Sequence, residues 1–600
     1  MSNVFKKLLD SKQNKLYILL AFLVIGTALY SPFVHNHFTY DDFLFVTFLE
    51  EKTPVNPLIG FWAVDYKYVK VFQSMWWIDK DAWGYFFRPV PSLVITAAYN
   101  IWGRDSALWL HLFSILLHCI NAFLVFVLLN RLSKNYPVSL IAGFLYLIFA
   151  HHIINVGWIA TNTDLLAVFF MALCLIFYLK FRQEGRLLFF ALSTVMLIFA
   201  YGCKETASIT PAAIMLYEFI YIDEDKISIV KRFGLFFKKW KYWIFSLFLL
   251  AGFLIYYKAA GFGVNSLMYH DPFIKPAAFL KNLFIGYPMM FLAMTSVAPI
   301  SFPVFMPELL TVFWIAGIIN MIVFLIILKP YYKDKTVIYC LLLFIVSILP
   351  QLSVDATERQ MYFPAVIGCF LIAYLIFQIP FIKWLSNIEY PKPVKYIGVI
   401  SAYYLLFSSV ILSLILMIAE PASYSSSAQK PEKYTLQAKE IADKYNANKI
   451  FLINSPGSLN LLYFADIYRF HSNNYIDFFV LFSGDGKVWL KKENDSTVSV
   501  KTDKKGWLTN MFSMLTRTDP VIKSGKIYSV PDFQVTLKKT TPEKDDLLEA
   551  EFLFKTIFKP GGSLLLYFDG ESIKQFDLKS TNTGEWIFIG DTSDILKIMM

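Results

Sequence analysis

Residues 16–34 read LYILLAFLVIGTALYSPFV, and this stretch decides the class of the protein. As a helix it is long enough to cross the hydrocarbon core of a bilayer, which is about 30 Å thick. Four lysines precede it at positions 6, 7, 12 and 15. It is longer than the apolar region of a signal peptide and lacks a convincing small-residue cleavage site. We therefore expect an uncleaved transmembrane helix with its amino end inside the cell.

Similar apolar runs recur along the chain. Hydrophobic residues make up 57% of the 600 residues and charged residues 17%, whereas a soluble domain carries about 25% charged residues. The further candidate spans are residues 107–130, 138–151, 163–180, 187–201, 207–221, 243–259, 308–328, 336–349, 362–381 and 397–418. The sequence thus predicts an α-helical polytopic membrane protein with about eleven transmembrane helices. A disordered chain, a collagen-like chain, a disulfide scaffold and a purely soluble enzyme are excluded.

The charge distribution predicts the topology. The net charge is +10, but the residues from 420 onward hold equal numbers of acidic and basic side chains, so the excess lies in the membrane part. With the N-terminus cytoplasmic, the basic clusters fall on the cytoplasmic side, as the positive-inside rule requires. Residues 281–300 are apolar but interrupted by Gly286, Pro288 and Pro299. A crossing there would reverse the later loops, so we expect a re-entrant or interfacial segment in the cell membrane.

Two domains are predicted, a transmembrane domain over residues 1–419 and an extracytoplasmic soluble domain over 420–600. The outer loop 35–106 is rich in tryptophan, which favours interfacial helices at the lipid headgroups; its members include Trp62, Trp76, Trp77, Trp83 and Trp102. A Ser/Pro/Lys-rich linker is expected over 421–433. Beyond it, a helical segment and short β-type runs separated by turn residues predict a small α+β or mostly β domain. Because no soluble basic face exists, nucleic-acid binding is excluded.

An acidic pair follows the first span in the sequence FTYDDF, residues 38–43. Partial desolvation and a neighbouring acid both raise the pKa of a carboxyl group, which adapts Asp41 or Asp42 to general-base catalysis. The alternative interpretation is a solvated turn or a helix N-cap.

Other polar side chains are predicted to gather on the same outer side. Arg88 lies in FFRPVPS and Arg359 in ERQMYFP, and a guanidinium beside aromatic rings is suited to a lipid phosphate. The alternative for each arginine is an ion pair or an interfacial position. The remaining residues of the predicted substrate pocket are His111, His152, Asp164, Lys204, Glu205, Glu358 and Tyr362.

Metal sites and soluble-enzyme motifs find no support. The five cysteines all fall in apolar segments, and the adjacent His151 and His152 point about 100° apart on a helix. We therefore predict no metal site from spacing, although the need for a divalent metal stays open. Phosphate-binding loops, zinc-protease motifs and serine-hydrolase motifs are not found.

Several segments together resemble the GT-C glycosyltransferases. After the acidic pair and the Arg-Pro segment come HLFSILLHCINA (111–122), AHH (150–152), WIATNTDLL (158–166), KE (204–205) and ERQMYFP (358–364). In this order, over residues 15–385, they are similar to the protein O-mannosyltransferases and to the membrane region of tetratricopeptide-bearing transmembrane mannosyltransferases.

The resemblance implies transfer of a hexose from a polyprenyl-phosphate carrier to an acceptor outside the membrane. The acceptor is a glycan, a lipid or a protein. The first acid of the pair, Asp41, corresponds to the general base of the family, although Asp42 remains an alternative. Arg359, and in second place Arg88, would hold the donor phosphate. A single displacement would invert the anomeric centre.

Two other classes of function are compatible with the sequence. A transporter or flippase for a lipid-linked or anionic substrate would explain the proline-bearing segment 281–300. A non-catalytic envelope scaffold would use the tail to bind cell-wall or partner molecules.

Overall fold

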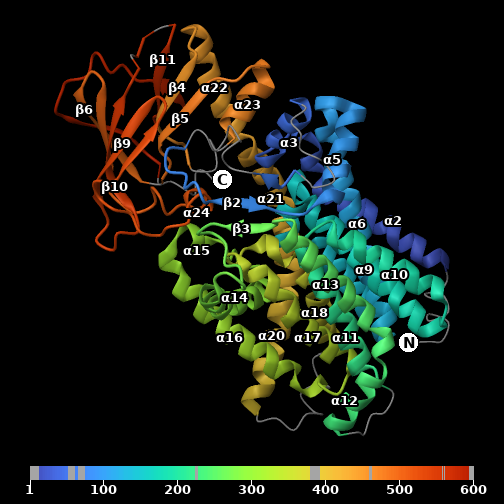
Figure 1. The fold of residues 1–600 in the computed structure, drawn as a ribbon. Coiled ribbons are helices and arrows are strands. Elements are labelled where there is room, and N and C mark those ends of the chain that lie inside the picture. The colour runs from blue at the N-terminus through green and yellow to red at the C-terminus, as the bar shows by residue number, and fades with distance from the viewer. Residues whose placement is uncertain are drawn as a thin grey trace.

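The computed structural model describes residues 12–51, 61–64, 75–222, 228–378, 392–457, 463–484, 486–556, 558–559 and 561–592. A large helical bundle is joined to a C-terminal body of strands and helices at one of its ends (Figure 1). The bundle consists of α2 (Lys12–Tyr30), α6 (Ser106–Ser133), α7 (Tyr136–Ile148), α9 (Asn162–Glu184), α10 (Leu187–Tyr201), α11 (Thr210–Ile220), α13 (Ile244–Ala259), α14 (Pro276–Ser296), α16 (Leu310–Leu328), α17 (Lys335–Ile348), α18 (Pro364–Gln378), α20 (Lys392–Leu406) and α21 (Ser413–Ala428). The structure confirms the prediction that a helical part is followed along the chain by a small body containing β-sheets.

Seven helical stretches of the described residues are long and apolar enough to cross a membrane, or eight if the bent pair Tyr136–Ile148 and Ala150–Gly157 forms one span. The seven are Asn14–His35, Pro89–Ser133, Ile159–Glu184, Pro276–Ser296, Pro307–Tyr331, Lys335–Ser353 and Lys395–Lys444. Three shorter apolar helices are Leu187–Tyr201, Ile244–Ala259 and Pro364–Phe377. The predicted eleven spans are therefore not confirmed, because several apolar runs form helices shorter than the about 20 residues of a straight crossing.

The segment predicted to be broken is one continuous helix. Helix α14 continues through Gly286 and Pro288 to Ser296, although a proline removes one backbone donor from a helix. The chain on both sides of α14 contacts one loop: His270 N donates to Ser353 O over 2.7 Å, and Ser301 N donates to Glu358 Oε1 over 2.8 Å. Helix α14 is one of the apolar helices long enough to cross a membrane, so the expected re-entrant or interfacial segment is not confirmed.

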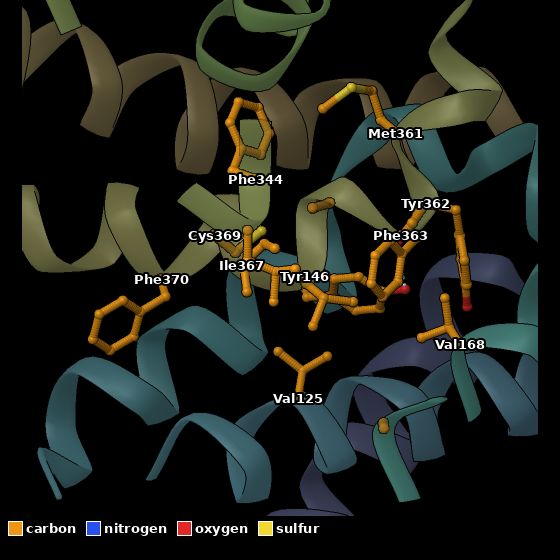
Figure 2. Close-up of a cluster of buried hydrophobic side chains, with 14 of the residues drawn as sticks. Val125, Tyr146, Val168, Phe344, Met361, Tyr362, Phe363, Ile367, Cys369 and Phe370 are labelled. Carbon is orange, nitrogen blue, oxygen red and sulfur yellow. Dashed lines mark hydrogen bonds between the residues drawn. The ribbon is translucent and has the colours of Figure 1, made fainter. Parts of the chain in front are cut away.

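The core of the bundle lies where α6, α7, α9, α17 and α18 meet (Figure 2). Val125, Tyr146, Phe344 and Ile367 are almost completely buried there. The loop before α18 enters the same core with Tyr362, whose hydroxyl lies 2.9 Å from His118 Nδ1 on α6. The contact of Tyr362 with α6 thus fixes the loop that carries Arg359 to the core of the bundle.

An outer layer separates the bundle from the C-terminal body. It contains helix α3 (Asp41–Glu50), helix α5 (Pro89–Trp102) and a small sheet in the order β1-β2-β3. Strand β2 (Trp83–Tyr85) pairs with both β1 (Ala63–Val64) and β3 (Gly263–Asn265) in antiparallel register. This sheet ties the first outer loop to the segment between α13 and α14.

Two sheets and the helices α22 (Lys430–Lys444), α23 (Phe464–Ser472) and α24 (Met511–Leu515) make up the described part of the C-terminal body. One sheet has the order β12-β11-β4-β5, from β4 (Lys449–Asn454), β5 (Asp477–Phe482), β11 (Ser563–Phe568) and β12 (Ile573–Gln575). The antiparallel second sheet has the order β13-β6-β7-β10-β9-β8, from β6 (Lys487–Asn494), β7 (Thr497–Thr502), β8 (Ile527–Val530), β9 (Phe533–Thr540), β10 (Leu547–Phe554) and β13 (Trp586–Asp591). The rings of Phe451 and Phe533 pack between the sheets. Helices α22 and α23 pack against β4 and β5.

Two expectations about the outer parts are wrong. Trp76 and Trp77 do not lie at the headgroups but are buried, 3% and 1% exposed, in a core shared by the outer loop and the C-terminal body. Trp76 Nε1 donates to Leu481 O of β5 over 3.1 Å. The linker expected over 421–433 is helical, because α21 extends to Ala428 and Pro431 fits the first turn of α22. The body is thus packed firmly onto the outer loop.

Candidate active site

The two acids of the predicted pair have different environments. Asp42 is 1% exposed, and both its carboxylate oxygens accept hydrogen bonds. Thr39 N and Thr39 Oγ1 donate to its Oδ2 over 3.0 and 3.2 Å, and Ala160 N donates to its Oδ1 over 2.9 Å. This second acid therefore binds the start of α3 to the chain before α9, and its oxygens are occupied by the protein itself.

Asp41 is the more accessible acid, at the first position of α3. The residue before it, Tyr40, has φ +50°, a conformation that a non-glycine residue rarely adopts. Such backbone strain concentrates at functional sites. Burial raises the pKa of Asp41 to about 6, and the nearby guanidiniums of Arg359 and Arg88 limit that rise. A carboxyl with this pKa accepts a proton near neutral pH.

A tyrosine of the C-terminal body contacts the same carboxylate. The hydroxyl of Tyr463, directly before α23, donates a hydrogen bond to Asp41 Oδ1. Helices α3 and α23 lie side by side (Figure 1). Arg469 of α23 and Arg104 both bind Glu50, at the end of α3, over 2.9 and 2.7 Å. These ion pairs fix the orientation of α23 and, with it, the position of Tyr463.

Arg359 provides the unpaired positive charge of the site. Its guanidinium lies 5.5 Å from the ring centroid of Trp158, and its backbone oxygen accepts a bond from Asn155 Nδ2 over 3.1 Å. Within the described ranges its guanidinium forms neither a hydrogen bond nor an ion pair. The adjacent Glu358 is 8% exposed and accepts from Ser301 N and Oγ over 2.8 and 3.0 Å. The five donors of Arg359 are thus available to an anionic ligand.

The second arginine is already paired. Arg88 Nη2 lies 3.2 Å from Glu205 Oε2, and its guanidinium lies over the ring of Phe86 at 4.6 Å. The ion-pair alternative of the sequence analysis is therefore the one that the structure shows for Arg88. Lys204 is paired as well, 2.5 Å from Asp164 Oδ1. Burial lowers the pKa of Lys204, and Asp164 opposes this effect.

Tyr269 joins these groups electrostatically. Burial raises its pKa, while Arg88 and Arg359 lower it and Glu205 and Asp41 raise it further. Its ring lies 5.7 Å from that of Phe86. The structure thus brings together ionisable groups from five parts of the sequence: Asp41, Arg88, Lys204 with Glu205, Tyr269 and Arg359.

Three predicted pocket residues lie deeper, within the packed helices. His111 is buried with Nε2 3.3 Å from His37 O. His152 Nδ1 lies 3.0 Å from Tyr146 O, and Tyr362 OH accepts from Asn121 Nδ2 over 3.2 Å. Figure 2 shows Tyr362 within the hydrophobic core. Tyr362, with the ring of His152 4.6 Å from its own, supports the loop of Arg359 from inside the bundle, whereas His111 contacts the chain before α3.

Tyr463, Tyr269 and Trp158 are site residues that the sequence analysis did not select. Tyr463 lies 422 positions from its partner Asp41, in an apolar run that looks like ordinary core. Trp158 is the first residue of the quoted segment WIATNTDLL, which was the available signal for it.

The described residues do not fit a divalent-metal site. Over the described ranges, no three side chains of His, Cys, Asp or Glu gather as ligands. Asp42 is saturated with protein donors, and Asp41 is bonded to Tyr463. We therefore derive no step through a metal.

Comparisons with known proteins give only distant structural similarity. No family model matches the sequence, and no curated protein matches it. Solved structures of the oligosaccharyltransferase AglB of Archaeoglobus fulgidus are similar to this chain. One, tethered to an acceptor peptide, has 12% identity and a TM-score of 0.40, covering 75% of this chain and 63% of that one. Another, with an inhibitory peptide and a dolichol-phosphate, has 13% identity and a TM-score of 0.39, covering 80% and 66%. The present chain thus spans less than two thirds of those proteins.

Proposed function

We propose that this protein is a membrane glycosyltransferase. It transfers a hexose from a polyprenyl-phosphate carrier to an acceptor hydroxyl on the extracytoplasmic face of the cell membrane. One observation supports this most: a desolvated carboxyl group, Asp41, and the unpaired guanidinium of Arg359 act on each other electrostatically at one end of the bundle. A base beside an anion-binding group is the minimum that such a transfer requires.

The chemistry follows from these two groups. Asp41 removes the proton of the acceptor hydroxyl while the acceptor oxygen attacks the anomeric carbon of the sugar. The bond from that carbon to the phosphate oxygen breaks, and the electron pair leaves with the polyprenyl phosphate. Arg359 stabilises the negative charge that develops on this oxygen. The products are an inverted glycoside, polyprenyl phosphate and a proton, which Asp41 releases to water.

The other residues of the site hold these two in place. Asp42 fixes the first turn of α3 through Thr39 and Ala160. The Arg88–Glu205 and Lys204–Asp164 pairs form the neighbouring wall of the site. Tyr463 brings the C-terminal body to the acceptor side of Asp41. We propose that Asp41 is the catalytic base and that Asp42 is a positioning residue.

The proposal is tested with purified full-length protein in phospholipid vesicles. A panel of polyprenyl-phosphate hexoses is offered, with membrane extracts as the source of acceptor, and released polyprenyl phosphate is measured by mass spectrometry. We expect protein-dependent cleavage of at least one donor. Movement of intact donor across the vesicle without cleavage would instead identify a transporter, and neither activity with any donor would contradict both.

The pH dependence of transfer provides a first prediction. Because burial raises the pKa of Asp41 to about 6, its carboxylate is the minor form below that pH. The base must be unprotonated, so kcat/KM should fall about tenfold for each pH unit below about 6 and level off above it. Initial rates between pH 4.5 and 8 measure this limb. A rate that stays constant down to pH 4.5 would show that no group with this pKa acts as the base.

Replacing Tyr463 with phenylalanine provides a second prediction. The tyrosine hydroxyl donates to Asp41, which favours the carboxylate and lowers its pKa. A hydrogen bond to a charged group contributes about 1.5–3 kcal/mol, and 1.36 kcal/mol corresponds to one pKa unit. The acid limb of the Tyr463→Phe variant should thus move up by about one pH unit. Tyr468→Phe, on helix α23 directly after Tyr463, is the matched control. An equal shift of the acid limb in both variants would show that the effect comes from a looser packing of α23 and not from the lost hydrogen bond.

A further inference from the structure

The end of the bundle opposite the C-terminal body carries a short helix with exposed apolar side chains. Helix α12 (Ile229–Lys238) connects α11 to α13 and lies at the far end of the bundle from the β-sheets (Figure 1). The topology predicted from the basic loops puts this end on the cytoplasmic side. None of the groups of the proposed active site lies on it.

One side of α12 packs on the protein. Phe236 is 5% exposed, and its ring stacks on that of Trp243 at 4.8 Å with an interplanar angle of 1°. Arg232 Nη1 donates to the backbone oxygens of Phe219 and Ile220, at the end of α11. These contacts fix the helix and determine which side chains remain outside.

Another side of α12 is apolar and largely exposed. Val230, Phe233 and Phe237 recur at spacings of three and four residues, which puts them on one helix face. They are 77%, 47% and 58% exposed. Trp240, just after the helix, is 56% exposed. Apolar side chains of this size gathered on one exposed face indicate a contact with a membrane or a partner.

Lysines flank this apolar face. Lys231 and Lys238 are seven residues apart and thus lie on one side of the helix, and Lys239 and Lys241 follow directly. Lys238 and Lys241 are exposed. A helix with an apolar face and lysines along its border lies in the plane of a bilayer, with the rings among the acyl chains and the ammonium groups at the phosphates.

We propose that α12 and the turn after it form a binding site for anionic phospholipid headgroups. Val230, Phe233, Phe237 and Trp240 insert into the lipid, and Lys238, Lys239 and Lys241 bind the phosphates. A zwitterionic headgroup carries no net charge for these lysines, whereas an anionic surface attracts each lysine near it with about 1 kcal/mol. This surface is independent of the proposed sugar transfer.

The test measures which lipids stay with the protein. Full-length protein is equilibrated with equal amounts of phosphatidylglycerol and phosphatidylcholine of the same acyl chains, and retained lipid is quantified by mass spectrometry. We expect enrichment of phosphatidylglycerol, reduced at least about fivefold by K238Q/K239Q/K241Q, since 1.4 kcal/mol corresponds to a tenfold change. The control R186Q/K329Q/K333Q removes the same charge elsewhere and should keep the enrichment. An equal loss of phosphatidylglycerol enrichment in both variants, or no enrichment in the native protein, would contradict the proposed binding site.

A second measurement does not depend on charge. A spin label on Val230→Cys reports the depth of the helix, because the five native cysteines are all buried and thus poorly reactive. In vesicles we expect greater collision with oxygen than with a water-soluble nickel chelate. The reverse ratio would place α12 in water and contradict the interfacial position.

Discussion

Asp41→Asn is expected to lower kcat for sugar transfer by about 10²–10⁴-fold, the usual contribution of a general base. Asparagine has nearly the same shape but does not accept a proton at any relevant pH, so the loss reports on proton removal. The hydrogen bond from Tyr463 has an acceptor in either case, since the asparagine oxygen takes the place of Oδ1. Initial rates with saturating donor and acceptor measure the effect.

Asp81→Asn is the matched control for this substitution. Asp81 lies on the same outer loop and is exposed, and its backbone oxygen, not its carboxylate, accepts from Asn265. The control should keep the native rate. Native activity in Asp41→Asn would remove Asp41 from the mechanism, and an equal loss of activity in both variants would assign the loss to general damage of the outer loop.

Arg359→Ala is expected to reduce kcat by about 10²–10³-fold, as for the loss of one group that stabilises developing charge. The KM for the lipid-phosphate donor should rise as well, because the same guanidinium binds the phosphate before reaction. Arg359→Lys should restore part of kcat, since it keeps the charge but loses the planar fork. Donor-dependent initial rates separate kcat from KM.

The paired arginine provides the contrast for Arg359. Arg88 is neutralised by Glu205, so Arg88→Lys should keep most of the rate while retaining an ion pair. If Arg88→Lys lost as much activity as Arg359→Ala, the phosphate would have to lie at Arg88. The assignment of the free cation would then be wrong.

Part of the candidate site could be selected from the sequence because polar side chains are costly near a membrane. Asp41 and Arg359 stand out against the apolar runs beside them, and their order along the chain indicates a common outer side. The sequence did not distinguish Asp41 from Asp42. Only the hydrogen bonds from Thr39 and Ala160 show that the second acid is occupied by the protein.

The contacts of the C-terminal body were not predictable. Tryptophan is a residue type typical of the lipid headgroup region. Trp76 is nevertheless buried, and its Nε1 donates a hydrogen bond to Leu481 O, 405 positions away. Tyr463 likewise depends on how α23 packs against α3. Such long-range packing leaves no periodic signal in the sequence. The continuity of α14 was missed because a proline usually interrupts a helix, whereas this helix continues past Pro288.

The proposed function requires that Asp41 and Arg359 act on one lipid-linked sugar. The most direct measurement is an experimental structure of the full-length protein with a non-cleavable polyprenyl-phosphonate hexose. We expect the phosphonate oxygens within about 3 Å of the Arg359 guanidinium. We also expect the anomeric carbon to lie between that group and the Asp41 carboxylate. A ligand bound at the opposite end of the bundle, or with its sugar out of reach of Asp41, would contradict the account.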